Sequence, residues 1–129
     1  IKVGDDIHLP KSFHRFAGLI EKLFYEKIIE SDGKKLLEIS DMSFSELIEK
    51  INPKNVVGLS CVGKSSSFCN VAKSLTNNSC LVIGGFQKTH FSDSTVSKID
   101  HLVSIGSNSL ESHIVTARIL YEYEKTIFK

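Results

Sequence analysis

Three short apolar segments, separated by helical patterns, constrain the fold of this chain most strongly. They cover residues 56–60, 80–83 and 101–105, and glycine, serine or another small residue closes each one. Strands that alternate with helices are joined by crossover connections, so neighbouring strands run in the same direction. The sequence therefore predicts an α/β domain with a mostly parallel sheet.

The first third of the chain carries local signals of its own. Apolar residues recur at steps of three and four between residues 12 and 29, which predicts an amphipathic helix. Asp32 and Gly33 predict a turn, and the apolar residues 36–39 predict a short strand. The length of 129 residues fits one domain, and because the chain starts with Ile1 rather than methionine we expect it to be part of a longer protein.

Three further helices are expected along the rest of the chain. Ser43 and Glu46 form a capping-box pattern ahead of a short helix that ends before Pro53. A second helix is expected over residues 65–75 and a long one over residues 110–128. Apolar residues cover more than one face of the long helix, which predicts burial on two sides, including a second subunit.

Composition excludes several classes of protein. The formal net charge is +1, so any nucleic-acid surface must be a local basic patch. Cys61, Cys69 and Cys80 form no CxxC pair and are odd in number, which indicates a reducing compartment and small buried thiols rather than disulfides. The five histidines show no zinc-ligand spacing, so we expect no metal site. Nor does any apolar run approach the roughly 20 residues that a membrane helix needs, and no secretory signal peptide is evident.

The stretch from Gly58 to Ser65 fits the Gly-x-x-x-x-Gly-Lys-Ser spacing of a nucleotide-binding P-loop. P-loop enzymes also need an acidic residue at the end of a neighbouring strand, where it holds magnesium. Both later apolar segments are followed by glycine and not by an acid. A strand-to-helix turn with Lys64 at the surface is therefore favoured, and a P-loop nucleotidase stays as the weaker alternative.

The small residues after the three apolar segments favour another kind of site. Parallel strands that end side by side leave a crevice where ligands bind. Small side chains let main-chain amide and carbonyl groups reach such a ligand, which suits a cofactor with an adenine and a ribose. Ordinary turns explain the same glycines, so this pattern does not name the cofactor.

Four stretches, in this order and spacing, resemble the Nep/Emg family of SPOUT-class methyltransferases. They read LPKSFHRFAGLIEKLF, VVGLS, LVIGGF and SLESHIVTARILYEYE. The resemblance is to the C-terminal part of that family, so residues 1–129 would form a single SPOUT-like domain without the family's N-terminal portion. It implies helices on both faces of the sheet and a C-terminal trefoil knot. It also implies a homodimer in ribosome biogenesis that uses S-adenosyl-L-methionine to methylate N1 of a pseudouridine in small-subunit ribosomal RNA.

The same resemblance implies which residues contact the cofactor. Two segments after the second and third strands would wrap it, together with the end of the first strand, largely through main-chain atoms. The implied residues are Leu59, Gly84, Thr89, His90, Phe91, Ile105, Gly106, Ser107, Asn108, Ser109 and Leu110. No catalytic residue is assigned.

A basic motif before the first helix is the expected RNA-binding segment. His8, Lys11 and Arg15 keep the spacing of the family's Arg-x-Pro-Arg-x-x-x-Arg stretch. Lys11 and Arg15 are four residues apart at the expected helix start, where they would share a face and grip phosphates. A solvated basic helix end is the structural alternative.

Two cofactor loops depart from the family pattern. Gln87-Lys88-Thr89 stands in place of Pro-His-Gly, and Asn108-Ser109 in place of Tyr-Pro. These changes keep open a second hypothesis, in which the chain is a non-catalytic relative that binds pre-ribosomal RNA. We expect a cytoplasmic location, or a nucleolar one if the source is eukaryotic.

Overall fold

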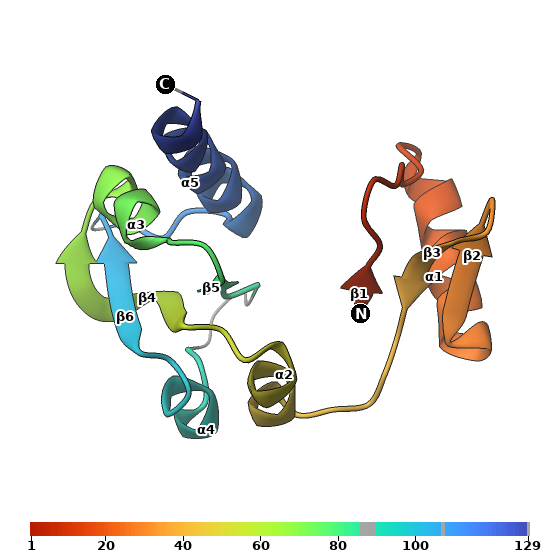
Figure 1. Cartoon of the computed structure of the whole chain (residues 1–129), viewed down its shortest axis with the longest axis horizontal. Coiled ribbons are helices and arrows are strands. Elements are labelled where there is room, and N and C mark those ends of the chain that lie inside the picture. Colours follow the sequence, from red (N-terminus) through yellow and green to blue (C-terminus); the bar gives the residue numbers. More distant parts are fainter. Residues whose placement is uncertain (86–89, 107, 129) are drawn as a thin grey trace. The chain divides into compact units, whose positions relative to one another are not determined.

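The structure, a computed structural model, describes residues 1–85, 90–106 and 108–128. The chain divides into two compact units, Ile1–Met42 and Ser43–Lys129 (Figure 1). Each unit has a sheet of its own. The expectation that both belong to one domain stays a prediction. No helix within the described residues is both long and apolar enough to cross a membrane.

The first unit is a helix packed on a small antiparallel sheet. Helix α1 (Phe13–Glu26) packs on a three-stranded sheet. The strand order in this sheet is β1 (Lys2–Val3), β3 (Lys34–Glu38), β2 (Ile28–Ser31). Leu23 of α1 is fully buried and packs with Ile29 and Leu37, which face each other across β2 and β3. This antiparallel sheet was not expected from the pattern of parallel strands, and β1 was missed.

The helix expected over residues 12–29 is wrong at its C-terminal end. Lys27 has a positive φ of 65°, which ends α1, and Ile28 starts strand β2. The expected turn at Asp32 and Gly33 is confirmed, since both have positive φ (52° and 74°) and Ser31 pairs with Lys34. Two residues with positive φ form the tightest kind of hairpin turn, which sets the pairing of Ser31 with Lys34. A register shift between Ile29 and Glu30 then brings Ile29 opposite Leu37.

The second unit contains the expected parallel sheet. Strand β4 (Asn55–Ser66) lies in the centre, between β5 (Ser79–Ile83) and β6 (His101–Ile105), and both pairings are parallel. The strands expected at residues 80–83 and 101–105 are thus confirmed. The trefoil knot implied by the resemblance stays a prediction.

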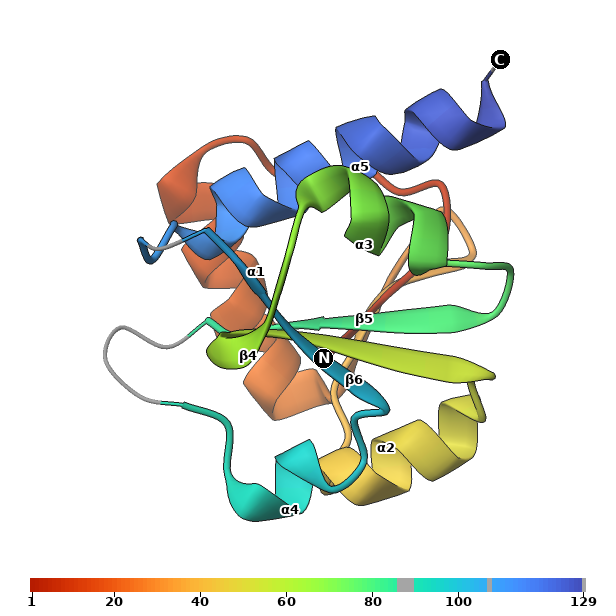
Figure 2. The same ribbon diagram turned by 90° about the vertical axis from the view of Figure 1, so that its left-hand side faces the viewer.

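Helices flank both sides of this sheet. Helices α3 (Phe68–Ser74) and α5 (Ser112–Ile127) lie on one side, and α2 (Phe44–Ile51) and α4 (Asp93–Val96) on the other (Figure 2). Val57, Val71 and Ile119 form the buried core between the sheet and the pair α3 and α5. The short helix α4 was not expected within the polar loop that contains it.

The expected capping box at the start of α2 is present. The Ser43 hydroxyl accepts a hydrogen bond from the Glu46 amide at 3.2 Å, and the Ser43 amide donates to the Glu46 carboxylate at 2.6 Å. Asn52, in the left-handed conformation, ends the helix one residue before the proline. This start signal satisfies two amide groups that a helix leaves without internal partners.

Strand β4 is longer than expected because it pairs with β6 twice. Leu59 and Lys64 are both in register with Val103, so residues 60–63 leave the ladder and return to it. At Gly63 the chain comes back so close to β6 that a Cβ there would lie 2.6 Å from the Val103 backbone. The helix expected over residues 65–75 begins only at Phe68, since Ser65 and Ser66 belong to β4.

This geometry excludes the P-loop. A P-loop wraps phosphate with the amide groups of a loop that opens directly into a helix. Here Lys64 and Ser65 are extended and paired with β6, and α3 has its own cap at Ser67, whose hydroxyl accepts from the Asn70 amide. The nucleotidase is wrong, and the match from Gly58 to Ser65 is accidental. The strand-to-helix turn lies at Ser67 rather than at Lys64, although Lys64 is exposed as expected.

Candidate functional site

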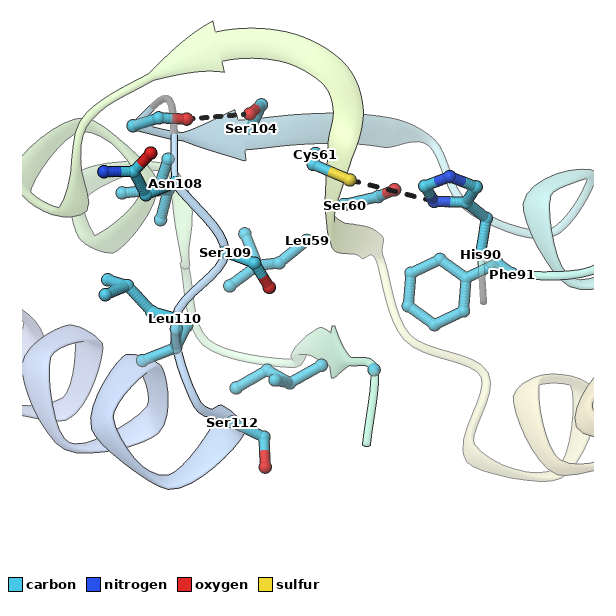
Figure 3. Close-up of a pocket in the computed structure, with 15 residues that line it drawn as sticks. Leu59, Ser60, Cys61, His90, Phe91, Ser104, Asn108, Ser109, Leu110 and Ser112 are labelled. Carbon is cyan, nitrogen blue, oxygen red and sulfur yellow. Dashed lines mark hydrogen bonds between the residues drawn. The ribbon is translucent and has the colours of Figure 1, made fainter. Parts of the chain in front are cut away.

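A pocket in the second unit lies where β5 and β6 end and where β4 leaves the ladder (Figure 3). Its walls come from the middle of β4, from the ends of β5 and β6, from the segments after these two strands, and from the first turn of α5. The lining residues are Leu59, Ser60, Cys61, Ile83, Gly84, His90, Phe91, Ser104, Ile105, Gly106, Asn108, Ser109, Leu110, Ser112 and Val115.

The topology explains why these residues meet. Leu59 is in register with Ile83 of β5 and with Val103 of β6, so the point where β4 leaves the ladder stands beside the carboxyl ends of β5 and β6. After β6 the chain lines the pocket and then enters α5 at Ser112. The Ser104 hydroxyl donates a hydrogen bond to the Gly106 carbonyl at 3.4 Å, which links the strand end to the turn after it.

The lining combines apolar side chains with small polar ones. Leu59, Ile83 and Leu110 supply aliphatic surface, while Ser109 and Asn108 supply a hydroxyl and an amide. No carboxylate stands among the lining residues that the structure describes. Such a surface can hold a flat apolar ring, while main-chain groups bind the polar atoms at the edge of the ring. Cofactor pockets usually have this mainly apolar lining with a few polar groups.

One polar pair stands at the rim. The Cys61 sulfur lies 3.8 Å from His90 Nδ1 and points toward the imidazole (Figure 3). Cys61 is exposed, so the expectation of a buried thiol is wrong for this residue, whereas Cys69 and Cys80 are partly buried. Cys61 is exposed because it lies in the four-residue excursion of β4. Burial raises the pKa of the Cys80 thiol, since the charged thiolate loses solvation there.

The comparisons with known proteins decide the family. The family model described as EMG1/NEP1 methyltransferase matches residues 1–124. The chain belongs to the EMG1/NEP1 methyltransferase family. This confirms the resemblance that the four sequence stretches carried.

Two curated relatives share the name "Ribosomal RNA small subunit methyltransferase Nep1". The Thermoplasma volcanium protein is 35% identical over 98% of this chain and 56% of its own length. The Archaeoglobus fulgidus protein is 30% identical over 97% of this chain and 55% of its own length. This EMG1/NEP1 chain therefore spans a little more than half the length of these relatives.

Two solved structures resemble this one. A crystal structure of Archaeoglobus fulgidus Nep1 bound to S-adenosylhomocysteine has a TM-score of 0.77 and 28% identity, covering 98% of this chain and 57% of that one. The SpoU methyltransferase AviRb from Streptomyces viridochromogenes has a TM-score of 0.55 and 16% identity over 92% of this chain and 46% of that one, a likeness in fold alone.

The expected cofactor residues gather in the pocket of this EMG1/NEP1 chain. Thr89 and Ser107 lie outside the described residues, and all the others line the pocket: Leu59, Gly84, His90, Phe91, Ile105, Gly106, Asn108, Ser109 and Leu110. Sequence reasoning missed Ser60, Cys61, Ile83, Ser104, Ser112 and Val115. Ser60, Ile83 and Ser104 directly adjoin an expected residue in the chain, so extending each expected segment by one position finds them.

The expected RNA-binding residues lie in the first unit. His8, Lys11 and Arg15 are all exposed. Helix α1 begins at Phe13 after the N-cap Ser12, so Lys11 precedes the helix. The argument that Lys11 and Arg15 share a helix face is therefore wrong, because only Arg15 is helical. Among the described residues, no three His, Cys, Asp or Glu side chains are placed to hold a metal ion.

Proposed function

We propose that this chain is the cofactor-binding part of an S-adenosyl-L-methionine-dependent methyltransferase that acts on small-subunit ribosomal RNA. One observation carries the proposal: the ends of β5 and β6 and the middle of β4 converge on one pocket, in a family of which one solved member is bound to S-adenosylhomocysteine. The names of the curated relatives support the ribosomal RNA substrate.

The lining suits this cofactor. Leu59, Ile83 and Leu110 present aliphatic surface for an adenine ring, and the main chain at Gly84 and Gly106 is open to polar edges. The cofactor supplies an activated methyl group on a sulfonium. The residues of this chain bind and orient it, and holding two reactants in line lowers the barrier to their reaction.

For the RNA, we propose N1 of a pseudouridine as the target atom and His8, Lys11 and Arg15 as the contacts. Exposed basic side chains position nucleic acids through phosphate, and the planar guanidinium of Arg15 can also stack on an unpaired base. The proposal of N1 rests on the family resemblance. The cytoplasmic location expected from the sequence stays a prediction.

We also propose a homodimer. Helix α5 buries Ile119, but its other apolar side chains include Leu120 and Tyr121, which are 53% and 61% exposed. A helix with apolar residues on more than one face normally has a second packing partner. This exposed surface supports the expectation of burial against a second subunit.

Calorimetric titration with S-adenosylhomocysteine tests the cofactor proposal. We expect the chain to bind, and Gly84→Arg to abolish binding because its side chain would occupy the pocket. Gly85→Arg is the matched control, since Gly85 is the next residue, does not line the pocket, and a Cβ there meets nothing within 4 Å. The control should bind as the wild type does.

The same titration, together with a measurement of RNA affinity, distinguishes the cofactor proposal from the non-catalytic alternative. If the wild-type chain does not bind S-adenosylhomocysteine, yet binds small-subunit ribosomal RNA with an affinity that Arg15→Ala removes, the cofactor proposal is wrong and the RNA-binding relative is favoured. Equal loss of binding in Gly84→Arg and Gly85→Arg would also count against the pocket.

A further inference from the structure

Cys61 is the one pocket residue with a thiol, among those that the structure describes, and the proposed function gives it no role. It is exposed on the excursion of β4 between the two segments that pair with β6. Its neighbours Leu59 and Ser60 also line the pocket. A group attached to the Cys61 sulfur would therefore lie at the pocket and take up space in it.

The imidazole of His90 stands next to this thiol. The distance from Cys61 Sγ to His90 Nδ1 is 3.8 Å, and His90 lines the same pocket (Figure 3). A thiol beside a proton acceptor is the arrangement that activates cysteine nucleophiles, since the thiolate is the reacting form. The acceptor lies on the segment after β5, so the fold brings together residues 29 positions apart.

The other two cysteines provide a contrast within one chain. Cys69 and Cys80 are partly buried, and burial raises the pKa of the Cys80 thiol. A raised pKa lowers the fraction of thiolate near neutral pH. Neither of them lines the pocket. Exposure, a neighbouring imidazole and a place in the pocket thus coincide at Cys61.

We propose that Cys61 is a thiol-modification site for small disulfides, and that its modification closes the pocket to the cofactor. The ligand class is a low-molecular-weight disulfide such as glutathione disulfide. The inference rests on the proposed function for the identity of the cofactor, but not for the reactivity of the thiol.

The reaction is a thiol–disulfide exchange. His90 Nδ1, in the tautomer that carries its proton on Nε2, takes the proton from Cys61 Sγ. The thiolate attacks one sulfur of glutathione disulfide, forming a new S–S bond as the old one breaks. The leaving glutathione thiolate takes the proton, and the products are one mixed disulfide and one glutathione. An excess of free thiol reverses the exchange.

The test measures modification and binding separately on the full chain. The protein is treated with glutathione disulfide, and the site is located by peptide mass spectrometry. We expect Cys61 to react about tenfold faster than Cys69 or Cys80. His90→Gln should slow the reaction at Cys61 without changing the rates at the other two. Bound S-adenosylhomocysteine should slow it as well.

The binding measurement uses S-adenosylhomocysteine before and after treatment. We expect treated wild type to lose binding and to regain it with dithiothreitol. Cys61→Ser should show the same dissociation constant with and without treatment, whatever that constant is, whereas Cys80→Ser should behave as the wild type does.

Three results would overturn the inference. They are equal reaction rates at the three cysteines, a rate at Cys61 that His90→Gln leaves unchanged, and a mixed disulfide at Cys61 that does not weaken binding. If untreated protein does not bind S-adenosylhomocysteine, the proposed function fails and the closing of the pocket fails with it. The reaction rates would still show whether Cys61 is a selective modification site.

Discussion

The two units of this chain differ in how far apart in the sequence their partners lie. In the first unit, β2 and β3 are joined by a two-residue turn, and Ile29 faces Leu37. In the second unit, β4 pairs with β6 far along the chain, as Val57 does with His101. Each unit contains residues that were expected in a helix and that lie in a strand: Ile28 in the first unit, and Ser65 and Ser66 in the second. In both units, pairing with a neighbouring strand outweighed the local helical pattern.

The separation in sequence between two paired strands decides whether local sequence signals can predict such a strand. Ile28 continues the helical spacing of α1, but the nearby turn at Asp32 and Gly33 signals a hairpin that needs a strand before it. Ser65 and Ser66 have no such neighbour, because Ser104 and Ile105 hold them in the sheet from far along the chain. The first error was avoidable from local signals, and the second was not.

The largest expected effect tests the long-range pairing directly. We expect Gly63→Val to destabilise the protein by roughly 4 kcal/mol, because the new side chain meets backbone that cannot rotate away. A Cβ at Gly63 would lie 2.6 Å from both the Val103 nitrogen and its carbonyl carbon. Urea denaturation followed by circular dichroism measures the change.

Two further variants keep this prediction testable. Gly63→Ala introduces the same contact with less bulk and should fall between the valine variant and the wild type. Gly85→Val adds the same side chain where a Cβ meets nothing within 4 Å, and it should cost less than about 0.5 kcal/mol. Equal stability of Gly63→Val and Gly85→Val would show that the return of β4 onto β6 is not tightly packed.

Much of the fold followed from sequence, and the reasons are local. Strand β6 matched its expected bounds because Leu102, Val103 and Ile105 lie between Asp100 and Gly106. The Asp100 carboxylate accepts a hydrogen bond from the Val56 amide at 2.8 Å. Helix α2 was found from its capping box. Strand β1 could not be found, since two residues carry no periodicity and only Leu37 and Glu38 define it.

Part of the site could also be predicted from the sequence, and part of it could not. The expectation of a crevice at the strand ends came from the residues themselves, and the pocket does lie at the carboxyl ends of β5 and β6. The individual positions came from the family resemblance. The contact between Cys61 and His90 could not be predicted from either source, because it depends on the four-residue excursion of β4.

A smaller effect compares helix starts in the two units. Ser12 precedes α1 and Ser43 precedes α2, yet only the Ser43 side chain makes a capping hydrogen bond. We expect Ser43→Ala to cost about 1 kcal/mol. Ser12→Ala should cost less than about 0.5 kcal/mol, since no capping bond is lost. If urea denaturation shows equal costs for the two variants, the capping geometry does not distinguish the units.

The smallest effect concerns the acidic partner in the same cap. The Ser43 amide, and then its hydroxyl, hydrogen-bond to the Glu46 carboxylate and hold its pKa below the ordinary 4.5. A carboxyl whose pKa is lower in the folded state stabilises the protein above pH 4.5, and this stabilisation disappears as the pH falls through the lowered value. We therefore expect the difference in unfolding free energy between wild type and Glu46→Gln to shrink between about pH 5 and about pH 3.

Taking the difference between two variants cancels the titration of every carboxyl group that they share. Ser43→Pro provides the control background, because the φ of −71° at Ser43 accepts proline and proline has no amide to donate. In that background the effect of Glu46→Gln should lose most of its pH dependence, since the main hydrogen bond to the carboxylate is gone. Suppose instead that Glu46→Gln, made in the wild-type background, changes the unfolding free energy equally at about pH 7 and about pH 3. The carboxylate would then gain nothing from the Ser43 amide, and the cap would act through the Ser43 hydroxyl alone.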